Sequence, residues 1–518
     1  MRLKITFWLS LLLFLSTAQL NAKSIKELDE YIEQVMMTFH IPGAAVGVVQ
    51  DGQIIHMRGY GVADITTNQP VNEQTIFKIA SNTKAFTATA LAILVEQGKL
   101  KWTDKVRDHL PDFKMHDDYA TQEFNIIDLL THRSGLALGS GDLMLWPEPT
   151  KFSREDVVHN LRYLKPAYGF RERYAYDNTL YIVAGEVASA VAGKPWEQVI
   201  EDSIFAPLGL KNCYAGGIDT TKVTNVVAPH LYLDDVLLVD DPNRIRKHST
   251  LMAAAGGIKC SVADVLTWIG LQLNQGQSLD GKRLVSKEQA AFMWQAVTPM
   301  SVSQRARELD NTNFRGYALG WRVSDFKGQW AVGHTGTLSG AMSEIVLLPQ
   351  SNLGVVVLLN QSTGYARSAM MYGVINYFLG ADPQQSLLRN IRWQQERQAW
   401  LKTAEAKQKG MVLPVEQAID LMDSRLGTYS DPWFGEITML REGNDVVFRA
   451  NKVPRMIGSV FQYDANTWWV KWHNRSFEAD SWIRFERTDK AVHMTMERMA
   501  EDSDWSMSVQ DLYFTQQK

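Results

Sequence analysis

The sequence has few cysteines and no histidine pattern typical of a metal site. Its 518 residues include only two cysteines, Cys213 and Cys260, which excludes a disulfide framework. Export would permit one disulfide, but we expect two unpaired, half-buried thiols. The 11 histidines show no His-Glu-x-x-His spacing of the kind that binds catalytic zinc, so no metal site is predicted.

An excess of charge of either sign is also missing. The formal net charge is -4 and the isoelectric point is about 6.3. Without a basic excess no nucleic-acid partner is expected, and without an acidic tail neither is a solvated interaction arm. Hydrophobic residues make up 45% of the chain, which is enough for a core of ordinary size. At roughly 150 residues per domain, the length predicts two or three domains.

Long apolar runs are absent except at the N-terminus. Basic residues precede an apolar run over residues 5–15, and small residues follow it. This three-part pattern predicts a secretory signal peptide over residues 1–22, cut after Ala22 or alternatively after Ala18. The run is shorter than the about 20 residues that a membrane span needs, and no later stretch is long enough. We therefore expect a periplasmic or secreted protein without a transmembrane segment after cleavage.

Strand signals at both ends of a helix-rich stretch predict one sheet covered by helices over residues 24–380. Asp51-Gly52 between two apolar runs is a strong hairpin signal. Residues 80–97 are apolar nearly all round, as in a helix buried in a large domain, and end at Gly98, a typical C-terminal cap. The other predicted elements are a helix over 25–39 and strands over 43–49, 53–60, 317–323, 329–333, 343–348 and 354–360.

The C-terminal part has a different texture. Residues 381–414 are predicted to be a helical linker, because 385–408 are charged and free of Gly and Pro. Over residues 415–518 short β-prone segments recur between turns, which predicts a small antiparallel barrel or sandwich. Its tryptophans are expected to fill the core, with an aromatic sugar-binding face as the alternative. The segments are 436–440, 446–449, 467–472, 482–485, 492–496 and 512–514, and the tryptophans are Trp433, Trp468, Trp469, Trp472 and Trp482.

Ser81-Asn82-Thr83-Lys84 opens the predicted buried helix. A serine hydroxyl needs a base, and residues three apart share a helix face, so Lys84 would lie beside the Ser81 oxygen. Burial lowers the pKa of a lysine, which favours a neutral base. A plain helix start is the alternative reading. The same pattern recurs at Ser324-Asp325-Phe326-Lys327, but there it lies between two strand signals before Gly328 and predicts a hairpin turn.

Two further elements carry candidate chemistry. Tyr176-Asp177-Asn178 offers a tyrosine whose pKa an ammonium could lower, and an amide able to contact both a substrate carbonyl and Lys84. Taken alone, a half-buried core tyrosine is the simpler reading. His334-Thr335-Gly336 lies in a glycine-rich stretch where a substrate backbone can approach closely, and the N–H of Thr337 is a candidate oxyanion donor. Taken alone, it is an ordinary turn with a surface histidine.

These three elements, in this order, resemble the serine β-lactamase, penicillin-binding protein and D-aminopeptidase family. Tyr-x-Asn in second place is similar to the class C β-lactamase and D-aminopeptidase branch. The resemblance covers residues 25 to about 380 and implies an α+β fold, with an antiparallel sheet flanked by helices. Other segments similar to that branch are Leu129-Leu130-Thr131-His132-Arg133-Ser134-Gly135-Leu136, Pro207-Leu208-Gly209-Leu210 and Ala254-Ala255-Gly256-Gly257.

The C-terminal part resembles a second known domain. Gly427-Thr428-Tyr429 and Pro432-Trp433-Phe434-Gly435 are similar to the lipocalin-like β-barrel often appended to such hydrolases. In some relatives this barrel guards the active site or builds an oligomer. A homo-oligomer formed through the C-terminal domain is therefore an expectation from the resemblance.

The family resemblance implies two-step acyl transfer on Ser81 without a metal or organic cofactor. Lys84 and Tyr176 would share the proton transfers, and the backbone N–H groups of Ser81 and Thr337 would hold the oxyanion. Asn178, together with the strand residues Thr335, Gly336 and Thr337, would contact the substrate. Water would then cleave the acyl-enzyme.

His334 departs from the family pattern, because β-lactamases and carboxypeptidases of the family mostly have lysine there. Histidine is largely neutral at pH 7, so strong β-lactamase or D,D-carboxypeptidase activity is not expected, and His334→Lys should raise acylation by penicillins. Relatives with histidine at this place include D-aminopeptidases, which favours a small-molecule or peptide substrate with an amide or ester bond. A broad carboxylesterase and a penicillin-binding or peptide-binding protein with vestigial activity are the alternatives.

Overall fold

The computed structural model describes residues 25–233, 235–240, 250–409, 425–464, 467–474, 477, 480–489, 491–499 and 509–517. The predicted signal peptide lies outside these residues and stays a prediction. Within them, no helix is both long and apolar enough to cross a membrane.

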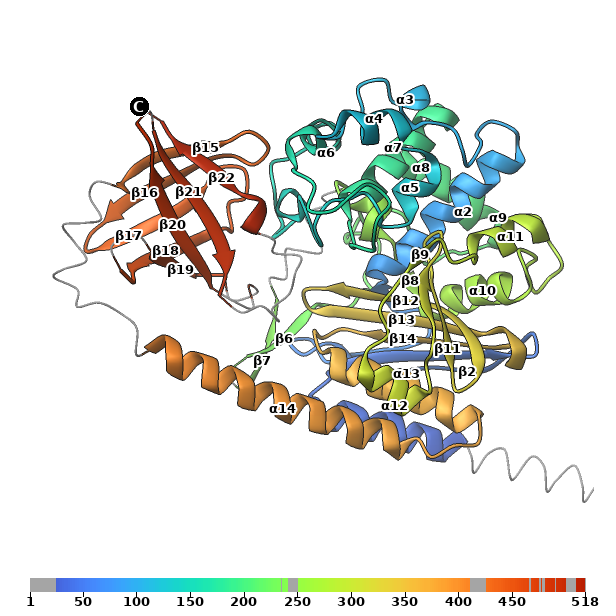
Figure 1. Ribbon diagram of the computed structural model, residues 1–518. Coiled ribbons are helices and arrows are strands. Elements are labelled where there is room, and N and C mark those ends of the chain that lie inside the picture. The colour runs from blue at the N-terminus through green and yellow to red at the C-terminus, as the bar shows by residue number, and fades with distance from the viewer. Residues whose placement is uncertain are drawn as a thin grey trace, which may run out of the picture.

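A nine-stranded antiparallel sheet forms the centre of the N-terminal part, in the order β3-β2-β1-β14-β13-β12-β11-β10-β9 (Figure 1). The hairpin predicted at Asp51-Gly52 joins β1 to β2, and β1 pairs with β14, which joins the two ends of this part of the chain. The strands are β1 Gly43–Gln50, β2 Gln53–Asp64, β3 Gln69–Pro70, β9 Thr298–Pro299, β10 Arg315–Tyr317, β11 Arg322–Phe326, β12 Gln329–Leu338, β13 Ala341–Leu348 and β14 Leu353–Leu359.

Helices cover both faces of this sheet, and each face has its own apolar core. On one face lie α2 (Thr83–Glu96), α7 (Thr179–Ala192) and α10 (Val262–Leu273). On the other lie the helix over residues 25–38, α13 (Gly364–Phe378) and α14 (Gln384–Lys409), whose long axis runs below the sheet in Figure 1. The α+β class with an antiparallel sheet flanked by helices is confirmed.

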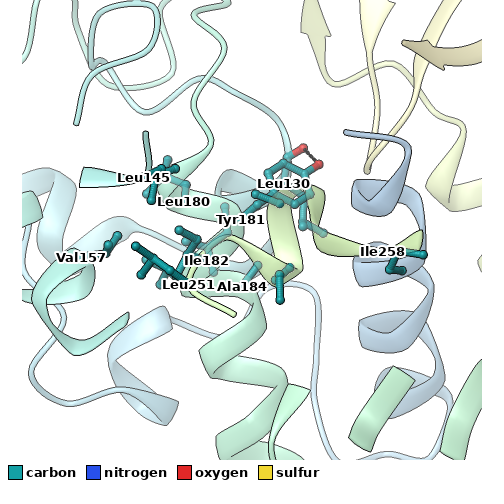
Figure 2. Close-up of a cluster of buried hydrophobic side chains, with 14 of the residues drawn as sticks. Leu130, Leu145, Val157, Leu180, Tyr181, Ile182, Ala184, Leu251 and Ile258 are labelled. Carbon is teal, nitrogen blue, oxygen red and sulfur yellow. Dashed lines mark hydrogen bonds between the residues drawn. The ribbon is translucent and has the colours of Figure 1, made fainter. Parts of the chain in front are cut away.

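The core around α7 joins several segments of the helical layer (Figure 2). Leu180, Ile182 and Ala184 of α7 pack with apolar side chains from neighbouring segments, and the hydroxyl of Tyr181 donates a hydrogen bond to the carbonyl of Leu130 at 2.7 Å. The smaller helices of this layer and its surroundings are α3 Val106–His109, α4 Asp118–Glu123, α5 Ile126–Leu130, α6 Arg154–Asn160, α8 Trp196–Ile200, α9 Ala206–Leu208, α11 Lys287–Met293 and α12 Gln304–Asp310.

The two cysteines form a disulfide, so the expectation of unpaired thiols was wrong. Cys213 lies on β5 (Cys213–Tyr214) and Cys260 on β8 (Lys259–Ser261), and the two residues are direct partners in this antiparallel ladder. Their Cα atoms are 4.1 Å apart. A pairing across 47 residues depends on strand register, which the isolated sequence did not reveal. The other short strands are β4 Ile76–Lys78, which also pairs with β8, and the hairpin β6 His230–Leu233 and β7 Val236–Val239.

Two strand predictions beside the sheet centre need correction. The predicted strand over 317–323 is two strands, β10 and β11, separated by a turn at Gly320 with φ +79°. A Cβ atom at Gly320 would lie 2.7 Å from the carbonyl oxygen of Lys84, so the turn packs directly on α2. Strand β12 runs on to Leu338, beyond the predicted end at 333, and thus contains His334-Thr335-Gly336. The predicted hairpin turn after Phe326 is present.

The C-terminal part is a closed eight-stranded barrel. Trp433, Trp468 and Trp472 are at most 3% exposed, as expected for a barrel core, whereas Trp469 and Trp482 are half-buried. Helix α14 occupies the predicted linker region before it (Figure 1). The barrel strands are β15 Gly427–Asp431, β16 Gly435–Glu442, β17 Asp445–Ala450, β18 Ile457–Gln462, β19 Thr467–Trp472, β20 Ser481–Arg487, β21 Val492–Arg498 and β22 Tyr513–Gln516.

Candidate active site

Ser81 lies in a short 3-10 turn, η1 (Ala80–Asn82), that leads directly into α2. The preceding Ala80 has a left-handed φ of +47°, an uncommon and strained value for a non-glycine residue. Hydrogen bonds dock the turn on the sheet, because Ser343 Oγ on β13 donates to the carbonyl of Ile79 at 2.6 Å and accepts from Asn82 Nδ2 at 2.8 Å. The nucleophile candidate is therefore held by both a helix and the sheet.

Lys84 lies one turn into α2, as predicted, and its side chain is completely buried. Its Nζ donates to Ser81 Oγ at 3.2 Å, to Asn178 Oδ1 at 2.7 Å and to the carbonyl of Ala255 at 2.8 Å. Burial holds the pKa of Lys84 well below its usual value, and the nearby Arg322 lowers it further while Asp142 raises it. In the neutral amine that the lowered pKa favours, two N–H groups donate to Asn178 and Ala255, and the lone pair is left to accept the Ser81 proton.

Tyr176 lies in the same cluster. Its phenol lies close to the Ser81 side chain, and its ring centroid is 4.8 Å from Lys84 Nζ. Burial raises the pKa of Tyr176, and this effect outweighs the opposing effects of Arg322 and of the nearby Ser81 side chain. The expectation of a lowered tyrosine pKa was wrong, because the nearby Arg322 charge does not compensate for the loss of solvent. Tyr176 is thus a neutral phenol, and the buried Lys84 amine is the better candidate for a base.

Asn178 is the N-cap residue just before α7, and two neighbours orient its side-chain amide. Its Nδ2 donates to Asp142 Oδ2 at 2.8 Å, so its Oδ1 faces Lys84. The intervening Asp177 points elsewhere, because its Oδ1 accepts from the Thr179 hydroxyl at 2.6 Å. Burial raises the pKa of Asp177 to about 6. Asp142 was not identified from the sequence, since nothing local marks it as a partner of a residue 36 positions away.

The end of β12 forms the other wall of the site. In the described part of the chain, β11 pairs with β12 only over Gln329–Gly333, whereas β13 pairs with it up to Leu338. Among the described residues, β11 therefore does not pair with β12 from His334 onwards, which leaves this edge as a candidate place for an extended substrate. A Cβ at Gly336 would lie 2.4 Å from the carbonyl oxygen of Ile79, so glycine lets this strand approach the turn that carries Ser81. Thr335 is half-buried and Thr337 exposed along the same edge.

His334 is not the surface histidine of the simplest reading, since it is only 2% exposed. Its Nε2 lies 2.9 Å from the Tyr317 hydroxyl and its Nδ1 lies 2.7 Å from the carbonyl oxygen of Thr335. With Nδ1–H donating to the carbonyl and Nε2 accepting from the phenol, the ring is neutral. Burial lowers the pKa of His334 well below its usual value, and Arg322 and Lys84 lower it further. The histidine is thus a neutral part of the wall.

Arg322 on β11 is a site residue that the sequence did not reveal. Its Nη1 donates to Thr335 Oγ1 at 2.9 Å and lies 3.4 Å from His334 Nδ1. Its guanidinium carbon is 5.5 Å from the centroid of the Tyr176 ring. Arginine keeps its charge at all relevant pH values. A permanent cation therefore lies beside the strand edge, although position 334 itself carries none.

A second arginine supports this strand from the opposite helical layer. Arg367 on α13 donates to the Gly336 carbonyl at 3.2 Å and to Thr337 Oγ1 at 3.0 Å, and it is paired with Glu344 on β13 at 3.4 Å. It fixes the end of β12 on which the predicted oxyanion donor lies. Among the described residues, no group of His, Cys, Asp or Glu is arranged to hold a metal ion.

Comparisons with known proteins agree with this geometry. The sequence profile of the family described as Beta-lactamase matches residues 28–376, and that of a Domain of unknown function (DUF3471) matches residues 422–516. The chain is similar to the octameric penicillin-binding protein homologue from Pyrococcus abyssi, with a TM-score of 0.61, 21% identity and coverage of 95% of this chain and 100% of that one. A class C β-lactamase from Rhodobacter sphaeroides follows, with a TM-score of 0.55, 23% identity and coverage of 68% and 99%.

Two relatives that are similar in sequence have names other than β-lactamase. An unguisins hydrolase from Aspergillus campestris is 28% identical over 73% of this chain and 70% of its own length. Protein flp from Staphylococcus aureus is 27% identical over 67% of this chain and 65% of its own length. The structural neighbours share the fold, and the family profile spans well over half of the sequence. The chain therefore belongs to the β-lactamase family.

Proposed function

We propose that the protein is a serine hydrolase that forms an acyl-enzyme on Ser81 and cleaves amide or ester bonds of small peptides. The observation that carries the proposal is the position of the buried Lys84 Nζ, 3.2 Å from Ser81 Oγ and held by Asn178 and Ala255. A buried amine with a lowered pKa has little structural use and is costly, so its presence beside a hydroxyl favours catalysis.

The proposed reaction follows from these contacts. Neutral Lys84 removes the Ser81 proton while Oγ attacks the substrate carbonyl, and the N–H groups of Ser81 and Thr337 stabilise the resulting oxyanion. Collapse of the tetrahedral intermediate breaks the amide or ester bond, and Tyr176 passes the proton from Lys84 to the leaving group. A water molecule then attacks the acyl-enzyme, its proton returning to Ser81 along the same path.

Because His334 is neutral, we favour a D-aminopeptidase-like activity on peptides. A broad carboxylesterase is the alternative. The name of the relative from Aspergillus campestris, an unguisins hydrolase, supports hydrolysis over a vestigial binding function. Intact Ser81, Lys84 and Tyr176 support it as well. The third alternative, a penicillin-binding or peptide-binding protein, predicts labelling of Ser81 without turnover.

Arg322 favours a second candidate, a substrate that carries a free carboxylate. Its guanidinium lies beside Thr335 at the proposed substrate edge of β12, where its charge would attract a substrate carboxylate. The cation missing at position 334 is thus supplied from β11. A lysine at 334 would add a positive charge near Arg322 and Lys84. Contrary to the expectation from the sequence, His334→Lys should therefore slow acylation by penicillins.

We also propose that the protein is exported, with residues 1–22 as its signal peptide and a periplasmic or secreted mature form. The disulfide between Cys213 and Cys260 supports an oxidising compartment. The octameric neighbour supports the expectation of a homo-oligomer, and its formation through the C-terminal barrel stays a prediction. N-terminal sequencing of the mature protein and light scattering after size exclusion test these two points.

A fluorophosphonate probe followed by peptide mass spectrometry tests the function. We expect a single adduct on Ser81 in the parent and none in Ser81→Ala, with Ser324→Ala as the matched control because Ser324 belongs to the hairpin copy of the motif. A panel of p-nitrophenyl esters, D-aminoacyl p-nitroanilides and peptides with a free carboxylate then separates the candidates. Well-folded parent protein that stays unlabelled at Ser81 would contradict the proposal.

A further inference from the structure

A glycine turn at residues 139–142 connects the candidate active site with the C-terminal barrel. Gly139 and Gly141 both have left-handed φ values, +73° and +77°, which close the turn. The N–H of Gly139 donates to the Tyr176 carbonyl at 2.9 Å. At the other end of the turn, Asp142 accepts from Asn178 Nδ2. Both residues of the Tyr-x-Asn element are therefore positioned by this one turn.

Asp142 also determines which way the Asn178 amide faces. Its carboxylate accepts the amide N–H, so the amide oxygen is left to accept from Lys84 Nζ at 2.7 Å. Lys84 further feels the Asp142 charge, which raises its pKa, against burial and Arg322, which lower it. A displacement of Asp142 would therefore change both the position and the basicity of the proposed base.

The barrel packs against the outer side of this turn. Asn160 on α6 donates to the Trp433 carbonyl of the barrel at 2.8 Å and contacts Met144 Sδ at 3.6 Å. Met144 ends the short helix η2 (Asp142–Met144) that begins with Asp142 itself. The ring of Phe434 meets that of Phe152 with centroids 6.2 Å apart.

A carboxyl group of the barrel lies beside the turn. Burial raises the pKa of Asp511, on the short helix η8 (Val509–Asp511), and the nearby Ser140 hydroxyl and Gly141 N–H oppose this effect. The carbonyl of Asp511 also accepts from Trp433 Nε1 at 3.2 Å. Asp511 and Trp433 are thus joined to each other and contact the turn and its neighbour Asn160.

We propose that the barrel is a positioning part of the active site: through Trp433 and Asp511 it holds the 139–144 segment so that Asp142 orients Asn178 on Lys84. This inference rests on the proposed function, since it assigns a role to groups behind the same base. The barrel touches no reacting atom in this scheme. Its loss would leave the nucleophile in place but displace the support of the base.

The test compares substitutions on the two sides of the contact. Asp511→Ala removes the carboxylate beside Ser140 and Gly141, and we expect kcat for a p-nitrophenyl ester to fall about tenfold with KM nearly unchanged. Asp511→Asn keeps an acceptor oxygen and should retain most of the activity. Glu442→Gln, on an exposed ion pair with Arg449 on the outside of the barrel, is the matched control and should behave as the parent.

The pH profile distinguishes positioning from a general loss of stability. With Asp142 displaced, its charge no longer raises the pKa of Lys84, so the acid limb of kcat should move to lower pH in Asp511→Ala. Asp177, Arg322 and the phenol of Tyr176 also face Lys84 and are unchanged in this variant. Folded Asp511→Ala with the parent's kcat and pH profile overturns the proposal, as does an equal loss in Asp511→Asn and Glu442→Gln.

Two further measurements keep the result unambiguous. Should Asp511→Ala not fold, Asn160→Ser, which shortens the donor to Trp433, is judged by the same criteria. If the parent itself is not labelled at Ser81, the proposed function fails, and the inference is then decided by hydrogen exchange of residues 139–144 in the full chain. Faster exchange in Asp511→Ala than in the parent supports it, and equal exchange overturns it.

Discussion

The interior around Lys84 and the interior of the barrel differ in what they bury. The first contains a lysine that is completely enclosed, together with Asn178, Asp142 and a neighbouring arginine. The second is filled by aromatic rings, such as those of Trp472 and Phe448, whose centroids are 5.4 Å apart. Buried polar groups reduce stability unless they are matched, and apolar rings raise it. The first interior therefore suits the proposed catalytic role, and the second is an apolar core.

This comparison also locates the contribution of the barrel. Its interior supplies stability, while its corner at Trp433 meets the helical layer through Asn160. Substitutions in the two interiors should therefore differ in their main effect. Those near Lys84 should change activity, and those inside the barrel should change stability.

The largest expected effect comes from Lys84→Met. The substitution keeps the volume of the side chain but removes the base, so kcat/KM should fall by a factor of about ten thousand. Steady-state hydrolysis of an activated ester measures it. Lys105→Met, on a partly exposed lysine paired with Glu123, is the control and should retain activity. Substantial turnover by folded Lys84→Met would assign the base to another residue.

Gly336→Ala should have the next largest effect on activity. The added methyl group would lie 2.2 Å from Ser343 Oγ and 2.4 Å from the Ile79 carbonyl, so β12 must move away from the turn that carries Ser81. We expect a loss of about 1–3 kcal/mol in the free energy of unfolding and a lower rate of Ser81 labelling. Gly328→Ala, at a turn where a Cβ has open space, is the control for an added methyl group without a clash, although its positive φ adds a strain that Gly336 does not have. Equal labelling by both variants would be inconsistent with close docking of β12.

Trp468→Ala should act on stability alone. Trp468 is 1% exposed in the barrel interior, and its removal is expected to lower the free energy of unfolding by about 3–5 kcal/mol. Its neighbour Trp469 is half-buried and stacks on Phe461, so Trp469→Ala should cost clearly less. Chemical denaturation of both variants checks this. A larger loss in Trp469→Ala would argue against the aromatic core.

Arg322→Gln should change substrate preference. Without its cation, KM for a substrate with a free carboxylate should rise about tenfold, while the KM for a neutral ester changes little. Because glutamine can still donate to Thr335 Oγ1, the wall of the site is kept. The ratio of the two KM values is the measurement. An equal change for both substrates would remove the reason to favour carboxylates.

The smallest expected effect is a dependence of stability on pH. The folded-state pKa of Lys84 lies below that of an unfolded lysine, so the folded protein binds fewer protons between the two values. Stability of the parent relative to Lys84→Met should therefore rise as the pH increases from neutrality towards about 10. Thermal unfolding of both proteins across this range tests it, and parallel curves would indicate that Lys84 is not buried as described.

The local parts of the site could be predicted from the sequence. Ser81 ends up in the turn that leads into α2 and Lys84 one turn later, so the three-residue spacing correctly predicted that the two side chains lie together. The layered fold followed from strand signals at both ends of a helical stretch. The appended barrel followed from short β-prone segments between turns, although the sequence left a sandwich open as its alternative.

The other site residues and the disulfide could not be predicted, because they depend on contacts between distant segments. Arg322 lies on a strand whose register with β12 places it opposite Gly333, next to His334, and no local pattern marks it. The disulfide depended in the same way on the pairing of β5 with β8. The raised pKa of Tyr176 reflects complete burial, which sequence reasoning underestimated when it gave more weight to the neighbouring charge.

The pH dependence of Ser81 phosphonylation tests the central claim most directly. If neutral Lys84 is the base, the labelling rate of the parent should rise to a plateau with an apparent pKa well below the value of about 10.4 for a free lysine. The same limb should vanish in Lys84→Met. A rate that rises only near pH 10, or that keeps the limb after Lys84 is replaced, would contradict the account.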